Sequence, residues 1–229
     1  MQKLNSLLIS YFMDETSKNT LLLSTAYFPA LEYFVRFFKY EKVLIDIHET
    51  YPKQTWRNRC RILSANGLMD LSIPVERPYG NHTKTADIII SKHNSWQKIH
   101  WRSIESAYRN APFFIYYRDM VENLILDVKT NILQELNKQI LVNILEELNI
   151  HKSAESTNSF IQDSKGFADF RFSISPKAKD RSTKKDMIFE PYYQVFADKF
   201  GFQPNLSILD LLFNTGPDTL EYLHNKRID

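Results

Sequence analysis

Groups that can bind ligands or transfer protons gather densely in residues 48–61, HETYPKQTWRNRCR. This stretch directly follows an apolar run, Val43 to Ile47, so it begins where a buried segment ends. Acidic, basic, amide and guanidinium side chains at the edge of a core are typical of a site that holds a polar ligand. The stretch therefore predicts an anionic, polar small molecule as the ligand, but it does not specify a reaction.

The candidate catalytic residues are His48, Asp46, Glu49 and Lys53. Asp46 and His48 share a strand face because they alternate with apolar residues, and they lie at the carboxyl end, where open α/β sheets place their ligand crevices. A histidine beside a carboxylate is the usual general base, since the carboxylate fixes the tautomer and stabilises the imidazolium. Lys53 would neutralise developing negative charge. The alternative is that the acidic residue only caps a turn.

The candidates for substrate binding are basic, amide or aromatic side chains: Tyr51, Gln54, Arg57, Asn58, Arg59, His100 and Arg102. Arg57 and Arg59 would hold a phosphate or carboxylate through their forked guanidinium groups. Asn58 and Gln54 would bond sugar hydroxyls. Strand alternation from residue 57 to residue 63 would add Arg61 to the same face as the other two arginines. The alternative is a solvated strand face paired with acidic neighbours.

Two of these candidates lie on a predicted helix and have alternative interpretations. His100 recurs at helical spacing with Trp96 and Ile104, a pattern more typical of a core histidine than of a ligand-binding one. Arg102 lies on a different face, where it reaches either an anion or only solvent.

No metal site is expected, and the cofactor is undetermined. His48, Glu49 and His100 match no strong metal-ligand spacing, and a single cysteine, Cys60, excludes a cysteine zinc cage. With 5 glycines, the chain has no phosphate-binding glycine loop and no dinucleotide fingerprint.

Composition narrows the class of partner. The 29 Lys and Arg residues nearly balance the 27 Asp and Glu residues, which argues against nucleic acid. No apolar run approaches the roughly 20 residues of a membrane span, and the N-terminus lacks a cleavage signal. Cysteine usage fits the reducing cytoplasm. We expect a cytoplasmic protein that binds an anionic small molecule; a homo-oligomer is left open.

The first elements that must position these residues form a strand, a helix and a strand. Leu21–Thr25 and Val43–Ile47 are predicted strands, and Pro29 opens a helix between them. This order predicts a βαβ unit with parallel strands.

An antiparallel hairpin is predicted next. Arg57–Leu63 and Leu68–Val75 flank an Asn66-Gly67 turn, and Ala86–Ile90 is a further candidate strand. The predicted fold class is therefore α/β, with a mixed sheet that starts with the βαβ unit and continues with the hairpin.

The C-terminal half is predicted to be helical. Helices are expected over 95–111 and 112–148, and the apolar stripe of the second is typical of a core face. Residues 151–187 are rich in Ser, Lys and Asp and predict a mobile polar loop. Order should return at Pro191, where an apolar segment docks back, so we expect a single domain over 1–229.

Several separated motifs resemble, in order and spacing, the WbqC-like family of bacterial proteins. They are Tyr27-Phe28-Pro29 with Tyr33-Phe34, Trp56-Arg57-Asn58-Arg59, Leu71-Ser72-Ile73-Pro74-Val75, and Ser106-Ala107-Tyr108 with Pro112-Phe113-Phe114. The resemblance extends from about residue 21 to the last helix and is similar to Bacteroidetes-type members. The family's Gln-Pro opening and its Trp and Gly are replaced by Ser24, Thr25, Ala30 and Glu32.

This resemblance implies a link to surface polysaccharides and supplies no agreed set of catalytic residues. The resemblance does not specify a reaction. The first hypothesis is an enzyme of surface-polysaccharide precursor metabolism that transfers an acyl or aminoacyl group to a nucleotide-linked amino sugar, so that a nucleotide sugar joins the anionic small molecule as an expected partner. The alternative is a non-catalytic protein that binds a phosphorylated metabolite or a glycan in the same cleft.

Overall fold

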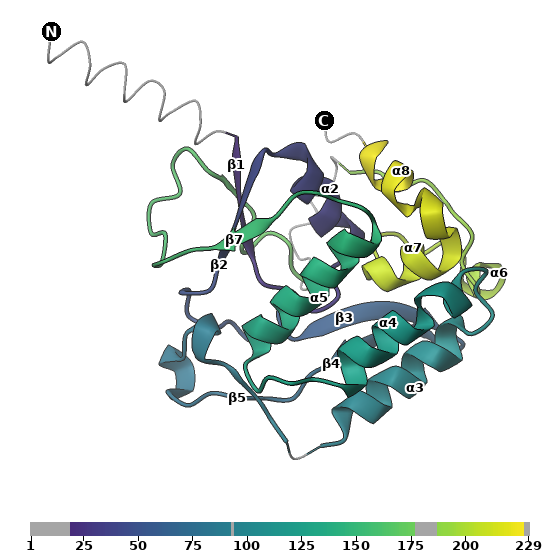
Figure 1. Cartoon of the computed structure of the whole chain (residues 1–229), viewed down its shortest axis with the longest axis horizontal. Helices are drawn as coiled ribbons and strands as arrows, with labels where there is room; N and C mark the ends of the chain where they lie inside the picture. Colours follow the sequence, from purple (N-terminus) through teal and green to yellow (C-terminus); the bar gives the residue numbers. More distant parts are fainter. Residues whose placement is uncertain (1–18, 93, 177–186, 227–229) are drawn as a thin grey trace, which may run out of the picture.

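The computed structural model describes residues 19–92, 94–176 and 187–226, and its largest sheet is a parallel one of four strands in the order β7-β2-β1-β8, which lies to one side of α5 (Figure 1). β1 (Thr20–Ser24) pairs with β2 (Lys42–Asp46) over the whole length of both strands. α2 (Leu31–Lys39) connects them, so the predicted βαβ unit is confirmed.

The outer strands of this sheet come from the segment predicted as a mobile polar loop. β7 (Ala154–Ser156) pairs parallel with β2, and β8 (Ala168–Asp169) pairs parallel with β1. The two strands are only 3 and 2 residues long and lack an apolar alternation, so no sequence pattern marks them. Residues 177–186 lie outside the described part of the chain, and the mobility of the segment stays a prediction.

The antiparallel pairs form separate small sheets. β3 (Arg59–Ser64) and β4 (Gly67–Ser72) make the predicted hairpin, and Gly67 has the positive φ of 98° that favours glycine in its turn. β5 (Val75–Glu76) pairs with β6 (Ile89–Ile90). The α/β fold class with parallel and antiparallel pairing is thus confirmed.

Short 3-10 helices replace part of one predicted strand. η1 (Gly80–His82) and η2 (Thr85–Asp87) precede β6, so the expected strand over Ala86–Ile90 is reduced to the last two residues. Backbone bonds from Thr85 and Ala86 to the carbonyls of Glu49 and Ile47 hold η2 against the end of β2.

The chain after β6 is largely helical, as predicted. The helices are α3 (Trp96–Tyr108), α4 (Phe114–Leu126), α5 (Leu133–Glu147), α6 (Ala197–Phe200), α7 (Ile208–Thr215), η4 (Gly216–Asp218) and α8 (Thr219–His224). The helix expected over 112–148 is interrupted at 127–132. There Ile132 forms an isolated bridge with Ile89, and its N–H donates to Thr130 Oγ1, so the chain is extended before α5 begins.

The C-terminal segment docks on the start of α2. Leu31 N donates to the carbonyl of Leu206 at 3.0 Å, and Ser207 Oγ donates to the carbonyl of Phe28 at 2.9 Å. The apolar residues of α7 are buried in the same core as those of β1 and α2. None of the helices in the described ranges combines the length and apolar character of a membrane span.

Candidate functional site

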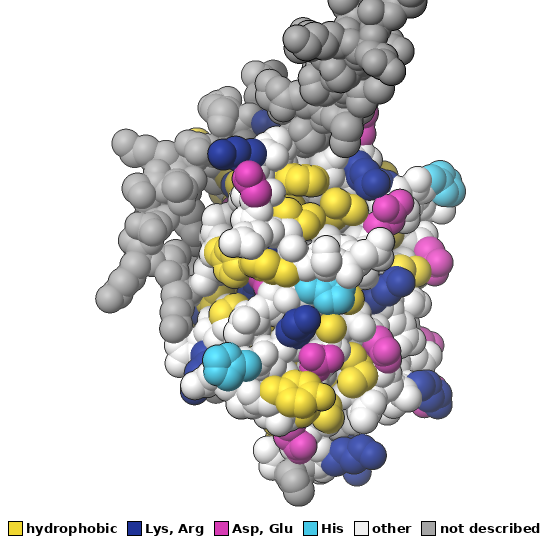
Figure 2. Space-filling model, turned by 90° about the vertical axis from the view of Figure 1, so that its left-hand side faces the viewer, with side chains coloured by type: hydrophobic (Ala, Val, Ile, Leu, Met, Phe, Trp, Pro, Cys, Tyr) yellow, Lys and Arg dark blue, Asp and Glu magenta, His cyan; other side chains and the backbone are white. Residues whose placement is uncertain are grey.

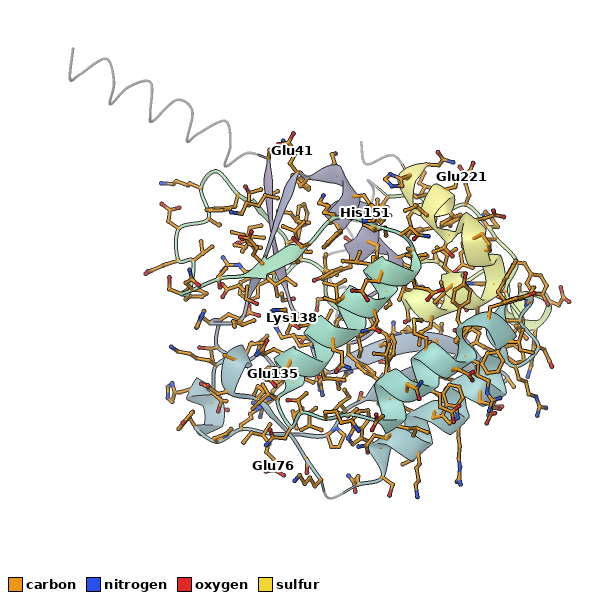
Figure 3. The ribbon with its side chains drawn as sticks, in the orientation of Figure 1. Glu41, Glu76, Glu135, Lys138, His151 and Glu221 are labelled. Carbon is orange, nitrogen blue, oxygen red and sulfur yellow. The ribbon has the colours of Figure 1, made fainter. Side chains whose placement is uncertain are left out.

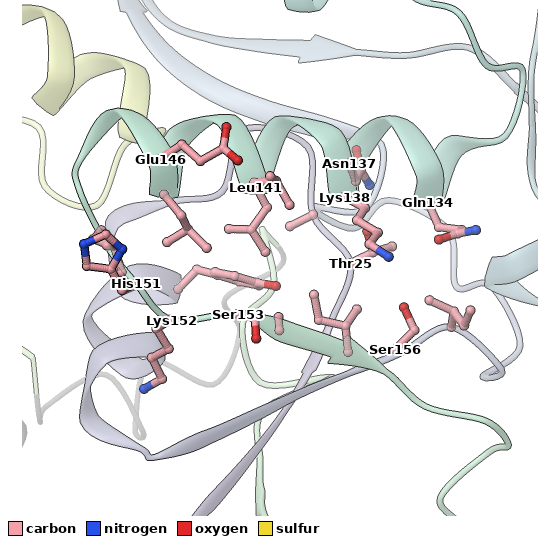
Figure 4. A pocket seen from close by; sticks show the side chains of 18 residues that line it. Thr25, Gln134, Asn137, Lys138, Leu141, Glu146, His151, Lys152, Ser153 and Ser156 are labelled. Atoms are coloured by element: carbon pink, nitrogen blue, oxygen red, sulfur yellow. The ribbon is translucent and has the colours of Figure 1, made fainter.

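A cavity of about 450 Å³ lies between α5 and the strands β2 and β7 (Figure 4). Its middle is apolar and is lined by Ile45, Ile47, Leu141, Val142, Leu145, Ile150 and Ala154. One end reaches the carboxyl edge of the sheet, because Thr25 follows β1 and Ser156 ends β7. Parallel sheets place their ligand sites at this edge.

Two consecutive residues of α5 supply polar groups at this carboxyl end. Lys138 projects from α5 (Figure 3), and the close-up of the cavity shows it directed toward Thr25 and Ser156 (Figure 4). Asn137 is 1% exposed, and its Nδ2 donates to the backbone carbonyl of Arg57 at 2.8 Å. Its Oδ1 has no hydrogen-bond partner among the described residues.

The opposite end of the cavity contains Glu146, His151 and Lys152. Lys152 Nζ donates to the carbonyl of Phe37 at 2.6 Å and also to the carbonyl of Tyr40. It thus satisfies carbonyl groups at the C-terminal end of α2. Partial burial lowers the pKa of Lys152 below its ordinary value. This ammonium has a structural role, and the other lysine that lines the cavity is Lys138, whose side chain is exposed.

Behind Asn137 lies a buried ion pair between Arg57 and Glu49. Arg57 Nε donates to Glu49 Oε1 at 2.7 Å, and the two side chains are 2% and 1% exposed. Burial raises the pKa of Glu49 to about 7, against the lowering effect of the Arg57 guanidinium. Glu49 Oε2 has no partner in the part of the chain that the structure describes. The guanidinium therefore faces a carboxylate inside the protein and does not point to solvent.

Arg171 joins this pair to the carboxyl ends of two strands. Its Nη1 donates to Asp46 Oδ2 at 2.5 Å, and its Nη2 donates to Asp169 Oδ2 at 2.6 Å. Its backbone carbonyl accepts from Arg57 Nη2 at 3.1 Å, and its Nη1 also donates to the carbonyl of Ile161. The hydrogen bonds of this one buried arginine thus connect β2, β8 and the loop between β7 and β8 to one another.

The predicted catalytic residues occupy different environments. Asp46 is fully buried, and its Oδ1 accepts from the backbone N–H of His48 at 2.9 Å. The imidazole of His48 is half-buried, and its Nε2 bonds to the carbonyl of Thr157 at 3.0 Å. The structure therefore brings Asp46 and His48 together through the backbone, not through the imidazole. Lys53 is exposed.

The three arginines do not form the predicted row. Arg57 precedes β3 and turns inward to Glu49, whereas Arg59 and Arg61 both pair with Asp70 of β4, at 3.7 and 2.7 Å. The prediction of one shared face is wrong because the regular alternation of the strand begins only at Arg59.

The remaining substrate-binding candidates do not line the cavity. Gln54 and Arg102 are exposed, and Asn58 Nδ2 donates to the carbonyl of Ile73 at 2.8 Å. Tyr51 is buried, with a hydroxyl that has no partner among the described residues.

His100 is a core residue, as its apolar stripe indicates. It is 3% exposed, and its Nδ1 forms a hydrogen bond with the hydroxyl of Tyr27 at 3.0 Å. Burial lowers the pKa of His100 to about 4, so the imidazole is neutral at physiological pH.

The sequence analysis did not identify three residues of the site: Asn137, Lys138 and Arg171. A signal for Asn137 exists, because it is a polar residue between Leu136 and Ile140 on the apolar stripe of α5. Arg171 lies in the segment interpreted as a loop, where no pattern marks it.

The side of the molecule that lies on the left in Figure 1 has a mixed surface (Figure 2). Basic and acidic side chains are interspersed with hydrophobic ones there, and the visible side chains form no continuous basic stripe of the kind that follows a nucleic-acid backbone. In the described ranges, no group of three or more His, Cys, Asp or Glu side chains is arranged to hold a metal ion.

Comparisons with known proteins show which family and which relative the chain matches. The model of the WbqC-like protein family matches residues 25–184, a range that contains the carboxyl end of the cavity and the buried arginine network. The chain is also 28% identical over 231 residues to the uncharacterized protein Rv1507c of Mycobacterium tuberculosis. This similarity covers 90% of the chain and 97% of that protein. No solved structure matches the chain.

Proposed function

Because the chain belongs to the WbqC-like protein family, we propose that it is a cytoplasmic enzyme of surface-polysaccharide precursor metabolism. It would transfer an acyl or aminoacyl group to a nucleotide-linked amino sugar. The observation that carries the proposal is the cavity between α5 and β7, which combines an apolar middle with a polar, cationic end at the carboxyl edge of the sheet.

The two parts of the cavity suit the two substrates of such a transfer. Ile45, Leu141 and Leu145 offer an apolar wall to an acyl chain. Lys138 offers an ammonium to a phosphate or carboxylate, and the hydroxyls of Thr25 and Ser156 lie opposite it (Figure 4). Lys138 and Glu146, near the two ends, are about 12 Å apart along α5, which leaves room for both substrates end to end.

His48 is the proposed general base; it is not part of the cavity lining but lies at the carboxyl edge of the sheet, next to the lining residue Ile47. Its Nε2 bonds to the carbonyl of Thr157, which can only accept, so Nε2 carries the proton. Nδ1 is then the basic nitrogen that can take a proton from an attacking amine. Asp46 and Arg171 would position His48, because Asp46 Oδ1 holds its backbone N–H and Arg171 holds Asp46.

A ligand screen tests the site. Nucleotide sugars, acyl-CoA compounds and amino acids would be screened by thermal shift, since a ligand at a hundredfold its Kd stabilises a protein by about 2.7 kcal/mol. Lys138→Met should remove the shift given by anionic ligands, because it keeps the length of the side chain and removes the charge. Lys98→Met, at an exposed lysine of α3 outside the cavity, is the matched control and should keep the shift. Equal shifts in both variants would place the ligand elsewhere.

One observation favours the second candidate, a non-catalytic protein that binds a phosphorylated metabolite or glycan. Asp46 and Glu49, two of the predicted catalytic residues, are almost completely buried in ion pairs with Arg171 and Arg57. Incubation of the protein with a sugar nucleotide and an acyl donor that both bind separates the two functions. Mass spectrometry should find the acylated sugar if the protein is a transferase, and only unchanged ligands if it is a binding protein.

A further inference from the structure

We propose that a second, smaller cavity of the protein binds one uncharged pyranose ring. It has a volume of about 200 Å³, below the range of about 300–1,000 Å³ that holds a drug-sized ligand, so it suits one small ring. It shares no lining residue with the cavity between α5 and β7. Trp56, Arg61, Gln203 and Glu32 are the lining side chains that can stack on a ring or bond to hydroxyl groups. This site is additional to the one proposed for the transfer reaction and does not depend on it.

The second cavity lies where segments far apart in the sequence meet. The backbone N–H of Ser207 donates to the carbonyl of Arg61 at 2.9 Å, and that of Leu31 donates to the carbonyl of Leu206 at 3.0 Å. Residues 203–206 are thus held between β3 and the first turn of α2, and the cavity opens beside them. Because main-chain hydrogen bonds fix the segment on both sides, these walls are in place without a ligand.

Trp56 supplies a flat wall that is anchored to its neighbours. Its backbone carbonyl accepts from Tyr27 N at 2.9 Å, and the guanidinium carbon of Arg61 lies 5.3 Å from the centroid of its ring. Two hydrogen bonds to Asp70, at 2.7 and 3.0 Å, hold Arg61 in turn. A half-buried indole anchored in this way loses little conformational freedom when a ligand stacks on it. The carbon-bound hydrogens on one face of a pyranose make such a contact.

Polar atoms of the lining side chains have hydrogen-bonding capacity left. Trp56 Nε1 and Arg61 Nη1 can donate and Gln203 Oε1 can accept, and none of the three has a partner among the described residues. They are not among the buried unpaired atoms, so solvent reaches them. Glu32 Oε2 accepts from Asn205 Nδ2 at 3.3 Å and has room for a further donor. Since a hydroxyl both donates and accepts, the neighbouring hydroxyls of a sugar match this mixed set of atoms.

The charges around the second cavity are already balanced. Glu32 pairs with Arg36 at 3.0 Å, and Arg61 pairs with Asp70 at 2.7 Å. In the first cavity, by contrast, Lys138 has no ion pair among the described residues. A phosphate is therefore attracted to the first cavity, whereas a ring with several uncharged hydroxyls suits the second.

Tryptophan fluorescence tests the site directly, because the tryptophans differ in exposure. Trp96 and Trp101 are 3% and 6% exposed, whereas Trp56 is half-buried and borders the cavity. Acrylamide should therefore quench mainly Trp56, and Trp56→Phe should remove most of the quenching. The probes are the methyl pyranosides of glucose, galactose, mannose and N-acetylglucosamine, with sorbitol as an open-chain control. At least one pyranoside should protect Trp56 from acrylamide in the full wild-type chain, and sorbitol should not.

Variants assign the protection to the lining side chains. Saturation-transfer NMR titrations with the most protective pyranoside should show about tenfold weaker binding by Trp56→Leu, which lacks the flat ring. Arg61→Met should bind about three- to tenfold more weakly, because it loses a donor and the anchor of the indole. Arg118→Met removes another ion-paired arginine, on α4 and outside the cavity, and should bind as the wild type does. Circular dichroism checks that each variant is folded; if Trp56→Leu does not fold, Arg61→Met decides.

Quenching that no pyranoside reduces would overturn the inference, and so would equal protection by sorbitol. Unchanged affinity in folded Arg61→Met would overturn it as well. Lys138→Met should keep the protection, and its loss there would move the sugar to the first cavity and contradict a second site. Protection by a pyranoside without any acyl transfer would support the second site and contradict only the transferase.

Discussion

At the scale of single residues, Arg57 is the side chain whose role a simple measurement can decide. Its guanidinium is enclosed with the carboxyl group of Glu49, so Arg57→Ala removes one partner of a buried ion pair. Loss of one partner of such a pair costs roughly 3–5 kcal/mol in the free energy of unfolding. Urea denaturation measures this loss. Arg102→Ala, at an exposed arginine of α3, should stay within about 0.5 kcal/mol of the wild type.

The opposite outcome for Arg57 is equally informative. An Arg57→Ala protein that is as stable as Arg102→Ala but no longer binds anionic ligands would show that the arginine holds a ligand directly. That was the expectation from residue types alone, because a guanidinium beside a polar cluster is typical of an anion site.

Residue types drew attention to the carboxyl edge of β2, but they could not assign the roles of the residues there. Arg57 forms a buried ion pair with Glu49, and Asp46 forms one with Arg171. Their burial depends on Arg171, which is 125 residues from Asp46 in the chain. Asn137 is likewise 80 residues from Arg57, the residue that orients it. A pattern confined to neighbouring residues cannot contain such contacts.

At the scale of elements, the start of α2 is stabilised by a residue far away in the sequence. The backbone N–H of Glu32 donates to Asn205 Oδ1 at 2.8 Å, which satisfies one of the free donors of the first helical turn. The N-cap residue, Ala30, has no side chain that could do this. The cap therefore also fastens the C-terminal segment to α2.

Three substitutions of Asn205 separate the stability that the cap contributes from the strain of the positive φ at this residue. Asn205 has a positive φ of 56°, which glycine tolerates better than alanine. Asn205→Gly should lose only the cap, about 1 kcal/mol of the free energy of unfolding, and Asn205→Ala should lose more. Asn205→Asp keeps the acceptor oxygen but puts a second carboxylate oxygen where Asn205 Nδ2 donates to Glu32 Oε2 at 3.3 Å, so it should also lose stability. Urea denaturation gives all three values, and a loss near zero for Asn205→Gly would show that the cap contributes nothing.

Elements with a strong local pattern were predictable, and those held by tertiary contacts were not. The Asn66-Gly67 turn and the apolar runs of β1 and β2 specified a hairpin and a βαβ unit that the structure confirms. β7 and β8 have almost no pattern of their own and exist because the edges of β1 and β2 pair with them. The break between α4 and α5 was also missed, since it depends on the bridge between Ile89 and Ile132.

At the scale of the whole molecule, buried titratable groups in three separate regions act on one folding equilibrium. Glu49 lies at the carboxyl edge of the sheet and His100 packs beside Tyr27 in the core. Asp210 of α7 accepts hydrogen bonds from the hydroxyls of Tyr108 and Tyr192, at 3.0 and 2.6 Å, and from Gln194 Nε2 at 2.7 Å. Their pKa values are displaced in opposite directions, so their effects on stability oppose each other.

The two carboxyl groups favour stability at low pH. Burial raises the pKa of Glu49 from 4.5 to about 7 and the pKa of Asp210 from 3.8 to about 6. The folded protein therefore holds protons that the unfolded chain has already released. Their contribution to stability is fully present below the unfolded pKa values and is lost as the pH rises through about 6 to 7.

His100 has the opposite effect. Its pKa is lowered from 6.5 to about 4, so the unfolded chain binds a proton more readily than the folded protein does. Its contribution is fully present above pH 6.5 and is lost as the pH falls through about 4. Between these limits one histidine opposes two carboxyl groups, so the free energy of unfolding of the wild type should fall by about 2 kcal/mol from pH 4 to pH 6.5.

Single substitutions should separate the effect of the histidine from that of the carboxyl groups on how the free energy of unfolding changes with pH. In His100→Gln only the two carboxyl groups remain, so the free energy of unfolding should fall from pH 4 to pH 6.5 more steeply than in the wild type. In Glu49→Gln or Asp210→Asn one carboxyl group is left to oppose the histidine, so the free energy of unfolding should stay nearly level over the same range. Urea denaturation at half-unit pH steps measures each curve relative to its own value at pH 4, which removes the packing cost of each substitution. Curves that run parallel to the wild type would show that these three groups do not set the pH dependence of the fold.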